Sequence, residues 1–374
     1  MQVEGVQKSP ILIASGLKPV KDSRAFEKLG LSLRETNKYS LNFIGFSAKS
    51  TFKQDGIRFF SSISHTKSPG QRLKMPFRFL RILLKIRPKI VICCTWEFLP
   101  FAKFFKPLLS YRLIYDVQEN YRSNLNLNPN LSSWKKKLGK KLIRWAESGK
   151  SIDYFLLAES SYASEMPEKT PHLILENKYA GPLPKPINEI NFEGKKEFHF
   201  VLGGTISPVF GSLDVINWFD EILKVHPKST LTLIGHVPLP SHQMEVEKMA
   251  ISNPKLNVIF SSDPIDHSKI LNAYQKADFV LMPYQNLPEI NSKMPTKLFE
   301  AAALGVPLLF SPNPKWEHFI QSYQGGYPID FKNTGLAITA FQQARLKSYF
   351  TQNPPVQIFW ESQEAEFLRL ISSL

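Results

Sequence analysis

The chain has 374 residues, of which 43% are hydrophobic. This length exceeds what one hydrophobic core usually organises, and a prior of about 150 residues per domain predicts two domains. No apolar run in the sequence approaches the roughly 20 residues of a membrane-spanning helix, and no signal-peptide pattern is recognised in residues 1–14. The two cysteines, Cys93 and Cys94, are adjacent within an apolar run. We therefore expect buried, reduced thiols and a cytoplasmic protein.

The net charge of +15 is unevenly distributed. Residues 1–185 carry 32 Lys and Arg against 14 Asp and Glu, a net charge of +18, whereas residues 186–374 carry 15 against 18, a net charge of −3. Two basic clusters account for much of this excess, one within residues 72–89 and one within residues 135–144. Such clusters are typical of surfaces that bind nucleic acid, anionic lipid headgroups or an acidic acceptor, and also of plain solvated helix faces.

Short apolar runs alternate with helical patterns along the whole chain. The runs expected to form strands are 11–14, 41–44, 90–94, 112–115, 154–158 and 173–175 in the first half, and 198–202, 230–234, 257–260, 279–283 and 307–310 in the second half. This alternation predicts an α/β protein with two doubly wound sheets.

A proline-rich segment, GPLPKP at 181–186, separates the two series of strands, and the net charge changes sign at the same place. We therefore expect an N-terminal domain over residues 1–180, a linker over 181–196 and a C-terminal domain over 197–345. Residues 346–374 end in a helical pattern. This segment is expected to form a packing helix that can join either domain, including a return to the N-terminal one.

The segment 291–307, NSKMPTKLFEAAALGVP, lies between two expected strands. Pro295 is suited to open a helix, residues 296–304 form its body, and Gly305 is suited to end it. The start of a helix after a parallel strand is a favourable place for a phosphate. Lys297 and Glu300 are one turn apart, so a diphosphate and the two hydroxyl groups of a ribose are suitable ligands for them. The segment therefore predicts a nucleotide-sugar site.

A second candidate for phosphate binding is the glycine-containing turn Gly203, Gly204 and Thr205, which follows the first expected strand of the second domain. Glycines here allow the backbone to approach a ligand closely. The segment does not match the GxGxxG dinucleotide pattern, and no GxxxxGK[ST] segment exists in the sequence. A strand-ending turn without a ligand is the alternative explanation.

Three carboxylates of the first domain follow expected strands. Glu97 follows the run 90–94, while Asp116 and Glu119 follow the run 112–115. Open α/β sheets bind ligands at this edge, so these residues are candidates for a catalytic base, an electrostatic stabiliser or a partner of an acceptor hydroxyl group. The alternative is that each caps the following helix.

The sequence shows no metal-binding pattern. The eight histidines are scattered, HExxH is absent and no Asp-x-Asp triplet exists, so no metal is expected and the histidines are interpreted as surface or packing residues. No GxSxG nucleophile motif is present either.

Together these residues resemble the GT-B glycosyltransferases, and within them the large retaining group often called family 4. The segment 277–284 (ADFVLMPY) and the segment 295–307 (PTKLFEAAALGVP) are similar to the family patterns ADxxLxPY and PxKxxExxAxGxP. Residues 113–119 (LIYDVQE) are similar to its YDxHE segment, and residues 153–160 (DYFLLAES) to one of its strands.

This resemblance implies two Rossmann-like domains that face a cleft, with a nucleotide-sugar donor held mainly by the C-terminal domain and an acceptor held by the N-terminal domain. It implies that Glu300 binds the donor ribose, that Lys297 meets the diphosphate, that Gly203, Gly204 and Thr205 approach the phosphates, and that transfer needs no metal.

The sequence also departs from the family pattern. Ser292 stands where the family has the first glutamate of an E-x7-E pair, so the contact with the donor sugar would come from backbone N–H groups of Ser292, Lys293 and Met294 or from elsewhere. Gln118 replaces the family histidine, and residues 206–214 lack the usual Arg and Lys.

The sequence thus favours a hexosyltransferase that uses a nucleotide-sugar donor and a cell-surface polysaccharide or lipid-linked acceptor. No separate cofactor is expected. The basic N-terminal half would place the enzyme against the anionic inner face of a membrane. Two alternatives remain open: a basic nucleic-acid-binding protein, which is disfavoured because no recognition module is present, and a nucleotide-sugar epimerase of the same fold.

Overall fold

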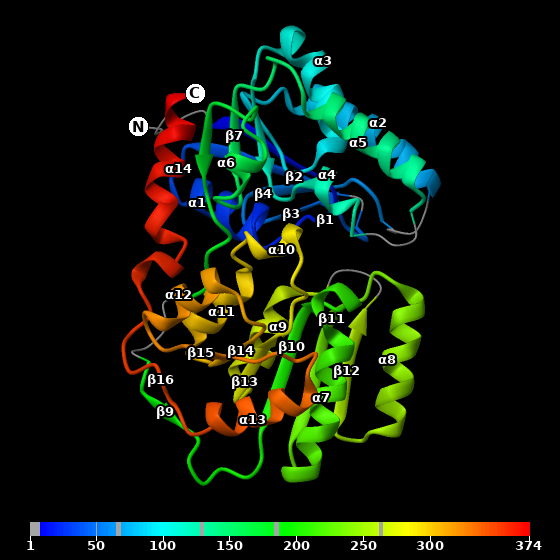
Figure 1. Ribbon diagram of the computed structural model, residues 1–374. Coiled ribbons are helices and arrows are strands. Elements are labelled where there is room, and N and C mark those ends of the chain that lie inside the picture. The colour runs from blue at the N-terminus through cyan, green and yellow to red at the C-terminus, as the bar shows by residue number, and fades with distance from the viewer. Residues whose placement is uncertain (1–7, 50, 65–68, 128–130, 183–186, 262–264) are drawn as a thin grey trace. The chain divides into compact units, whose positions relative to one another are not determined.

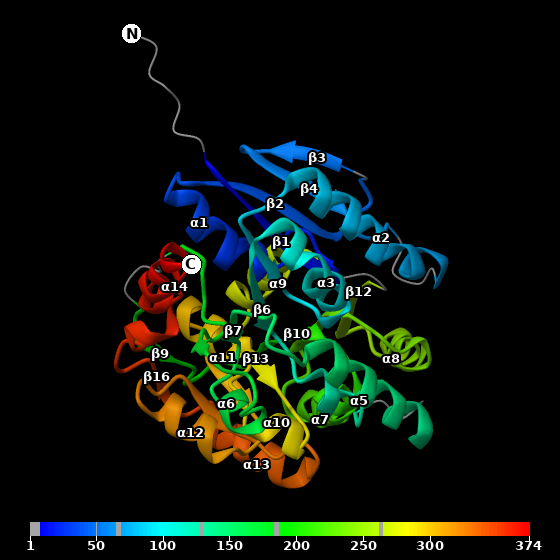
Figure 2. The same ribbon diagram turned by 90° about the horizontal axis from the view of Figure 1, so that it is seen from above.

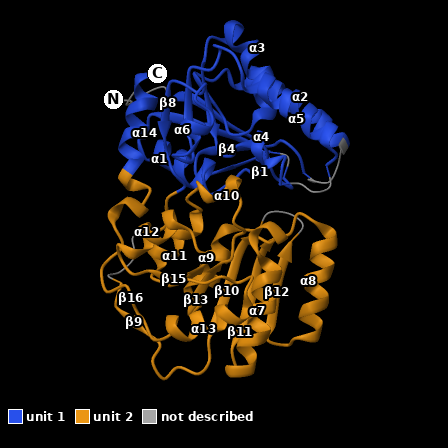
Figure 3. Cartoon of the chain, in the orientation of Figure 1, with its two compact units in different colours: residues 1–177, 363–374 blue, residues 178–362 orange. Residues whose placement is uncertain are grey.

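A computed structural model of the protein describes residues 8–49, 51–64, 69–127, 131–182, 187–261 and 265–374 (Figure 1). The chain divides into two compact units (Figure 3). Unit 1 comprises Met1–Asn177 together with Gln363–Leu374, and unit 2 comprises Lys178–Ser362. Each unit contains its own sheet and its own hydrophobic core.

Unit 1 is built on an eight-stranded sheet with the strand order β3-β4-β2-β1-β5-β6-β7-β8. Its neighbouring strands are parallel, except that β3 and β4 form an antiparallel pair at one edge. The strands are β1 (Ser9–Pro19), β2 (Tyr39–Phe46), β3 (Thr51–Gln54), β4 (Ile57–Ser61), β5 (Ile90–Cys93), β6 (Arg112–Val117), β7 (Tyr154–Leu157) and β8 (His172–Ile174).

Helices connect these strands. They are η1 (Ala25–Gly30), α1 (Leu31–Glu35), α2 (Pro69–Ile86), η2 (Trp96–Phe98), α3 (Leu99–Leu109), α4 (Tyr121–Asn124), α5 (Ser133–Glu147) and α6 (Tyr162–Glu165). The last helix of the chain, α14 (Glu361–Ser373), belongs to unit 1 from Gln363 onward.

Both faces of the unit 1 sheet are buried, as a parallel sheet with helical crossovers requires. Leu12 and Ala14 of β1 belong to the same core cluster as Phe79 of α2. Ile11 and Ile13, which point to the opposite face because side chains alternate along a strand, are also buried. Both cysteines are free and buried, which confirms the prediction of reduced core thiols.

Unit 2 is built on a six-stranded parallel sheet with the strand order β12-β11-β10-β13-β14-β15. A small antiparallel pair, β9 with β16, lies apart from it. The strands are β9 (Ile190–Asn191), β10 (His199–Thr205), β11 (Thr230–His236), β12 (Leu256–Ser261), β13 (Phe279–Met282), β14 (Leu308–Phe310), β15 (Gly326–Pro328) and β16 (Ser348–Tyr349).

The helices of unit 2 are η3 (Pro208–Phe210), α7 (Ser212–Val225), α8 (Pro240–Ser252), α9 (His267–Gln275), α10 (Pro288–Asn291), α11 (Thr296–Leu304), α12 (Pro314–Gln321), α13 (Thr334–Ala344) and η4 (Val356–Ile358). An aromatic cluster fills the core on one side of the sheet, with Phe200 at its centre. The rings of Trp218 and Phe341 lie 5.1 and 5.4 Å from the Phe200 ring, edge to face. Fully buried side chains of this size contribute roughly 1.5–3 kcal/mol each.

Each sheet reverses its direction of growth at one point. In unit 2 the chain proceeds from β10 outward to β12 and then returns to place β13 on the other side of β10. In unit 1 it proceeds from β1 through β2 to β4 and then places β5 on the other side of β1. Open α/β sheets bind ligands at the carboxyl ends of the strands that flank such a switch point. The topology therefore favours ligand sites at the carboxyl ends of β10 and β13 in unit 2, and of β1 and β5 in unit 1.

The prediction of two doubly wound α/β sheets is confirmed. The unit boundaries differ in detail from the predicted domains, because unit 1 ends at Asn177 and the C-terminal helix returns to it from Gln363. Residues 183–186 of the predicted linker lie outside the described residues, and Ile190–Asn191 of that linker pair with Ser348–Tyr349 inside unit 2. In the described part of the chain, no helix has both the length and the apolar content needed to cross a bilayer.

Candidate functional site

Helix α11 stands where the sequence predicts it. Pro295 is its N-cap, the helix covers Thr296–Leu304, and Gly305 ends it with a left-handed φ of 65°. The helix connects β13 to β14, so its first turn lies beyond the carboxyl end of β13. Lys297 in that first turn and Glu300, one turn further along, are both buried, with 6% and 5% of their surface exposed. Buried charged groups of this kind require specific partners.

Glu300 has a partner that its own segment does not contain. Its Oε1 atom lies 2.6 Å from Nε2 of His267, which begins helix α9. Asp266 caps α9 by accepting a hydrogen bond from the Ser268 backbone N–H, and this places His267 at the helix start. His267 is therefore a candidate site residue, whereas the sequence suggested only a packing or surface role. The two residues are 33 positions apart, so only the tertiary fold reveals the contact.

Lys297 is held against the end of β13. Its Nζ donates a hydrogen bond to the Leu281 carbonyl oxygen at 3.3 Å and lies 5.1 Å from the centre of the Tyr284 ring. Burial lowers the pKa of Lys297 from 10.5 to about 7, and the nearby charge of Glu300 acts in the opposite direction. An additional anion near Nζ would favour the ammonium form. The environment of Lys297 is therefore suited to respond to a bound phosphate.

The glycine-containing turn lies at the same edge of the sheet. Gly203 and Gly204 lie within the last three residues of strand β10, next to β13 at the switch point. A Cβ atom on Gly203 would lie 2.6 Å from the Tyr274 hydroxyl oxygen, so only glycine fits under that ring. Gly204 has φ 99° and open space around its Cα. Burial raises the pKa of Tyr274, and the charge of Glu300 raises it further. The turn, α9 and α11 therefore meet around Tyr274.

Figure 1 shows these elements close together within unit 2, with α9 and α11 beside the ends of β10 and β13. The structure thus brings the predicted residues Gly203, Lys297 and Glu300 to one edge of one sheet. Thr205, the last residue of β10, lies at the same edge.

The loop at Ser292, Lys293 and Met294 is held by hydrogen bonds of its own backbone. The backbone N–H groups of Ser292 and Lys293 both donate to the Ile290 carbonyl oxygen as α10 ends. In this conformation these two N–H groups are engaged within the loop, and their contact with a donor sugar stays a prediction. Met294 is buried, with 7% of its surface exposed.

The carbonyl groups of the same loop are fixed by α12. The Ser292 carbonyl oxygen accepts a hydrogen bond of 2.6 Å from Lys315 Nζ, and the Lys293 carbonyl oxygen accepts one of 2.8 Å from Trp316 Nε1. These contacts fix the loop that leads into the start of α11.

In unit 1, Glu97 lies at the switch point between β1 and β5. Thr95 follows β5 and accepts a hydrogen bond of 2.9 Å from the Gly16 backbone N–H. A Cβ atom on Gly16 would lie 3.4 Å from the Glu97 carboxyl carbon. Burial raises the pKa of Glu97, and hydrogen bonds from its own backbone N–H and from Thr95 oppose this shift. Glu97 thus has the position and the environment that a general base requires.

Two buried polar atoms near this switch point lack partners. Among the described residues, neither Oε2 of Glu97 nor the hydroxyl group of Tyr121 has a hydrogen-bond partner. Burial raises the pKa of Tyr121, and the charges of Glu119 and Glu97 raise it further. Buried polar atoms without partners are costly, which is typical of sites that complete their hydrogen bonds with a ligand. No sequence pattern identified Tyr121 as a candidate site residue.

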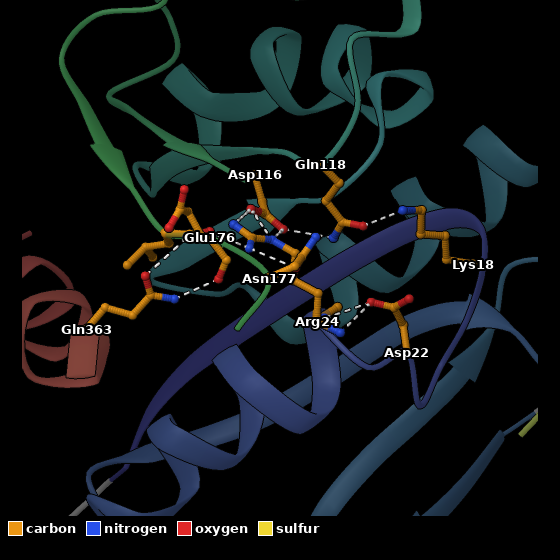
Figure 4. A network of polar contacts seen from close by, with 10 residues as sticks. Lys18, Asp22, Arg24, Asp116, Gln118, Glu176, Asn177 and Gln363 are labelled. Atoms are coloured by element: carbon orange, nitrogen blue, oxygen red, sulfur yellow. Dashed lines mark hydrogen bonds and ion pairs between the residues drawn. The ribbon is translucent and has the colours of Figure 1, made fainter. Parts of the chain in front are cut away.

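Asp116 belongs to a buried polar network. It is completely buried, and its two carboxylate oxygens accept hydrogen bonds from Arg24 Nε at 2.9 and 3.0 Å and from Gln118 Nε2 at 2.8 Å (Figure 4). Arg24 is 2% exposed and also donates to the Leu175 carbonyl oxygen. Both oxygens are thus engaged away from solvent in a network that supports the fold, and the catalytic role of Asp116 stays a prediction.

Glu119 is the most accessible of the three carboxylates, with 41% of its side chain exposed. It forms an ion pair with Lys18 at 3.2 Å and accepts a hydrogen bond of 2.9 Å from Asn124. Lys18 also donates to Gln118 Oε1, as Figure 4 shows. Neighbouring carboxylates, above all Glu119, raise the pKa of Lys18 against the opposing effect of burial. Glu119 is therefore bound to a cation and is available to solvent.

The fold is similar to those of solved carbohydrate enzymes. Sucrose-phosphate synthase from Thermosynechococcus elongatus matches with a TM-score of 0.66 at 12% identity, over 98% of this chain and 99% of that one. The catalytic domain of starch synthase IV from Arabidopsis thaliana, bound to ADP and acarbose, matches with a TM-score of 0.62 at 12% identity, over 98% and 99% of the two chains.

A Listeria monocytogenes protein assigned as a UDP-N-acetylglucosamine 2-epimerase also matches, with a TM-score of 0.57 at 12% identity over 98% of this chain and 96% of that one. No protein-family model matches the sequence, and no curated protein is significantly similar to it. At such low identity the similarity concerns the fold. The chain has the GT-B fold that the sequence resemblance predicted.

Proposed function

We propose that this protein is a glycosyltransferase that moves a hexose-type sugar from a nucleotide diphosphate donor to a glycan or lipid-linked acceptor. One observation carries the proposal: Lys297 in the first turn of α11 and Glu300 one turn further along share a face of the helix at the switch point of unit 2. A cation and a carboxylate in this order match the diphosphate and the ribose of one ligand. The starch synthase neighbour, which is bound to ADP, supports a nucleotide as that ligand.

Glu300 is proposed to accept hydrogen bonds from the two ribose hydroxyl groups. In the present structure His267 occupies one of its oxygens. Binding of the ribose would then either use the remaining lone pairs of the carboxylate or displace the imidazole. His267 is thus proposed to hold the Glu300 carboxylate in position before the donor binds.

Lys297 is proposed to stabilise the departing diphosphate. In the transfer, the acceptor hydroxyl oxygen forms a bond to the anomeric carbon and loses its proton. The bond between that carbon and the diphosphate oxygen breaks, and its electron pair stays on the diphosphate oxygen. The ammonium group of Lys297 and the positive end of α11 can stabilise the developing charge, which is electrostatic catalysis without the need for a metal. We propose transfer with retention of the anomeric configuration, on the basis of the sequence resemblance.

The acceptor side of the proposal rests on unit 1. Glu97 is proposed to accept the proton of the acceptor hydroxyl group, because its carboxyl group is buried and its Oε2 lacks a hydrogen-bond partner among the described residues. The proposed acceptor is a cell-surface polysaccharide or a lipid-linked glycan. The basic N-terminal half would bring the enzyme to such an acceptor at the inner face of an anionic membrane.

An epimerase that acts on the donor alone is the second candidate, and the Listeria neighbour favours it. The two reactions have different products. Incubation with a nucleotide-sugar and no acceptor yields an epimeric nucleotide-sugar if the protein is an epimerase. A transferase requires an acceptor, or releases free sugar and nucleoside diphosphate slowly by transfer to water.

Calorimetric titration with UDP, GDP and ADP tests the donor site. We expect one of these nucleotides to bind the wild type and Glu300→Ala to weaken that binding by about 10- to 100-fold, because hydrogen bonds to a charged group are lost. The matched control is Glu221→Ala, the same substitution on an exposed part of α7 in the same unit. The donor-site assignment is wrong if no nucleotide binds or if both variants bind like the wild type.

A further inference from the structure

Three neighbouring helices of unit 1 expose an unusual number of large hydrophobic side chains. Seventeen such side chains are exposed in the described part of the chain, and nine of them lie on α2, α3 and α5. They are Leu73, Phe77 and Leu84 of α2, Phe104 and Leu108 of α3, and Trp134, Leu138, Leu142 and Trp145 of α5. Single exposed hydrophobic residues are normal, whereas a concentration of this kind marks an interaction surface.

The exposed residues form stripes at helical spacing. On α5, Trp134, Leu138, Leu142 and Trp145 follow one another at intervals of four, four and three residues, which places them on one face. The opposite face of α5 is packed on the unit, where Ile143 is 4% exposed. Helix α5 therefore has two apolar faces. One packs on the rest of unit 1, and no part of the described chain covers the other.

The helices lie side by side. In Figure 2, α3 lies between α2 and α5. The ring of Phe77 on α2 is 6.1 Å from that of Phe101 on α3. On the other side of α3, Lys103 donates a hydrogen bond of 3.3 Å to the Trp145 carbonyl oxygen of α5 and lies 5.8 Å from the Trp145 ring. The three helices thus form one surface, here called the α2–α3–α5 surface.

Basic residues surround the apolar stripes. The α2–α3–α5 surface carries 13 Lys and Arg: Arg72, Lys74, Arg78, Arg81, Lys85, Lys103, Lys106, Lys135, Lys136, Lys137, Lys140, Lys141 and Arg144. Its helices contain one acidic residue, Glu147, which is buried and accepts a hydrogen bond from Tyr115. A solvated helix face usually alternates positive and negative residues along its length. The exposed charges on these helices are all positive, and of the 13 residues Lys106 is paired with Asp153, which lies outside the three helices.

We infer that the α2–α3–α5 surface docks on an anionic lipid bilayer and inserts its tryptophan, phenylalanine and leucine side chains into the interface. Exposed Trp, Phe and Leu beside Lys and Arg are the composition of helices that lie in a membrane interface. Anionic headgroups supply the opposite charge that the surface lacks. A second copy of the same surface would bring 13 further basic residues against it, so charge repulsion disfavours self-association.

The inference deepens the membrane association that forms part of the proposed function and rests on it: it identifies the surface that docks, the side chains that insert and the lipid charge that they meet. It fits a lipid-linked acceptor but does not depend on one. A test that measures binding to vesicles therefore separates its failure from a failure of the proposed glycosyltransferase activity.

Tryptophan fluorescence of the full-length protein provides such a test. Trp218, Trp316 and Trp360 are at most 3% exposed, whereas Trp134 and Trp145 are 64% and 60% exposed. Addition of vesicles that contain about 30% phosphatidylglycerol should shift the emission to the blue and protect these two residues from acrylamide, and phosphatidylcholine vesicles should not. Sedimentation with the vesicles gives the partition coefficient.

Two variants separate the apolar and the electrostatic contributions. Trp134→Ser with Leu138→Ser should lower the partition coefficient at least tenfold, because the inserted side chains are lost. Lys137→Gln with Lys141→Gln should lower it by roughly fivefold per lysine and weaken its dependence on salt. The matched control, Ile251→Ser with Leu336→Ser, removes two side chains of unit 2 that are 87% and 63% exposed and should bind like the wild type.

Two outcomes would overturn the inference. One is that vesicles of either composition leave the fluorescence of Trp134 and Trp145 unchanged while single-stranded RNA shifts it, which would make the surface a nucleic-acid surface. The other is that the variants on α5 and the control on unit 2 bind vesicles equally, which would show that net charge alone carries the binding. Circular dichroism verifies that each variant is folded.

Discussion

Lys297 and Asp116 show how the surroundings of a charged side chain set its role. Asp116 follows a strand, as catalytic carboxylates in α/β folds commonly do, yet both its oxygens are bound by Arg24 and Gln118 in a buried network. Lys297 is also buried, but its Nζ donates a hydrogen bond to a neutral carbonyl group, that of Leu281. The charge of Asp116 is balanced by Arg24 within the protein. Among the described residues, Lys297 has no such bond to a charged group, and it can still respond to a bound anion.

We predict that a nucleoside diphosphate binds with uptake of a proton at about pH 8. Lys297 has a pKa of about 7, so it is mostly neutral there, and the diphosphate would shift it to the ammonium form. Binding enthalpies measured in HEPES and in Tris, which differ in ionisation enthalpy, give the number of protons taken up. Lys297→Met should bind more weakly and without this uptake. Equal proton uptake in both proteins would show that another group titrates.

The same residue should affect stability in a pH-dependent way. Its folded pKa of about 7 lies below the ordinary value of 10.5, so the unfolded chain binds more protons between these pH values. Stability contributed by this residue therefore rises with pH across that window. Lys297→Met should stabilise the protein more at about pH 6 than at about pH 9 in urea unfolding. The opposite trend would contradict a buried, neutral lysine.

Asp116→Asn should destabilise the protein by about 3–5 kcal/mol, because it leaves the Arg24 guanidinium group buried without its counter-charge. Urea unfolding measures the loss. Glu119→Gln is the control, since its ion pair with Lys18 is partly exposed and should contribute only about 0–1 kcal/mol. Similar small effects of both substitutions would mean that the Asp116 network does not support the fold.

At the scale of elements, the switch point of unit 2 depends on a close approach between two chain segments. Gly211, the N-cap of α7, has φ 69°, and a Cβ atom there would lie 1.8 Å from the Pro283 carbonyl oxygen. Pro283 directly follows β13. The Val209 carbonyl oxygen accepts a hydrogen bond of 3.1 Å from the Gln285 backbone N–H in the same region. The turn after β10 is thereby fixed against the segment after β13, next to α11.

Gly211→Ala should therefore cost about 2–4 kcal/mol, as the sum of left-handed backbone strain and a steric clash. Gly194→Ala is a matched control in the same unit: Gly194 has φ 76°, and nothing lies within 4 Å of its added Cβ. The control should lose about 1–2 kcal/mol of stability, because the substitution introduces the backbone strain without the steric clash. Urea unfolding compares the two variants, and equal losses would show that the approach of Pro283 is not a constraint.

At the scale of the whole molecule, the chain has two units with separate cores and separate switch points. The proposed donor residues Gly203, Lys297 and Glu300 belong to unit 2, while Glu97, Tyr121 and the α2–α3–α5 surface belong to unit 1. The proposed functions are thus divided between the units. Each of them can be tested by an experiment that reports on one unit.

Hydrogen exchange should show this division. Saturation with a binding nucleoside diphosphate at about 100 times its dissociation constant should slow exchange in His199–Thr205, His267–Gln275 and Thr296–Leu304 by up to about 100-fold. The β3–β4 pair of unit 1 should exchange at an unchanged rate. Stronger protection in unit 1 than around α11 would show that the nucleotide binds to unit 1, which would contradict the proposed donor site.

The sequence predicted the elements whose residues interact locally. The central strands and α11 were recognisable because apolar runs, Pro295 and Gly305 act within a few residues of each other. The β3–β4 pair was missed because Lys53 and Arg58 break its apolar pattern at the sheet edge. Burial of Asp116 was also missed, since its partner Arg24 is 92 residues away and the charge pattern does not reveal the pairing.

The sequence by itself therefore determined the two doubly wound sheets, the start of α11 with Lys297 and Glu300, and the basic character of the N-terminal half. These features depend on residue type and short spacing. Only the tertiary structure decided that His267 pairs with Glu300, that the N–H groups of Ser292 and Lys293 are engaged by Ile290, and that the apolar stripes of α2, α3 and α5 share one surface. Side-chain partners and exposure depend on how segments distant in the chain pack together, and that packing is not encoded in any local pattern.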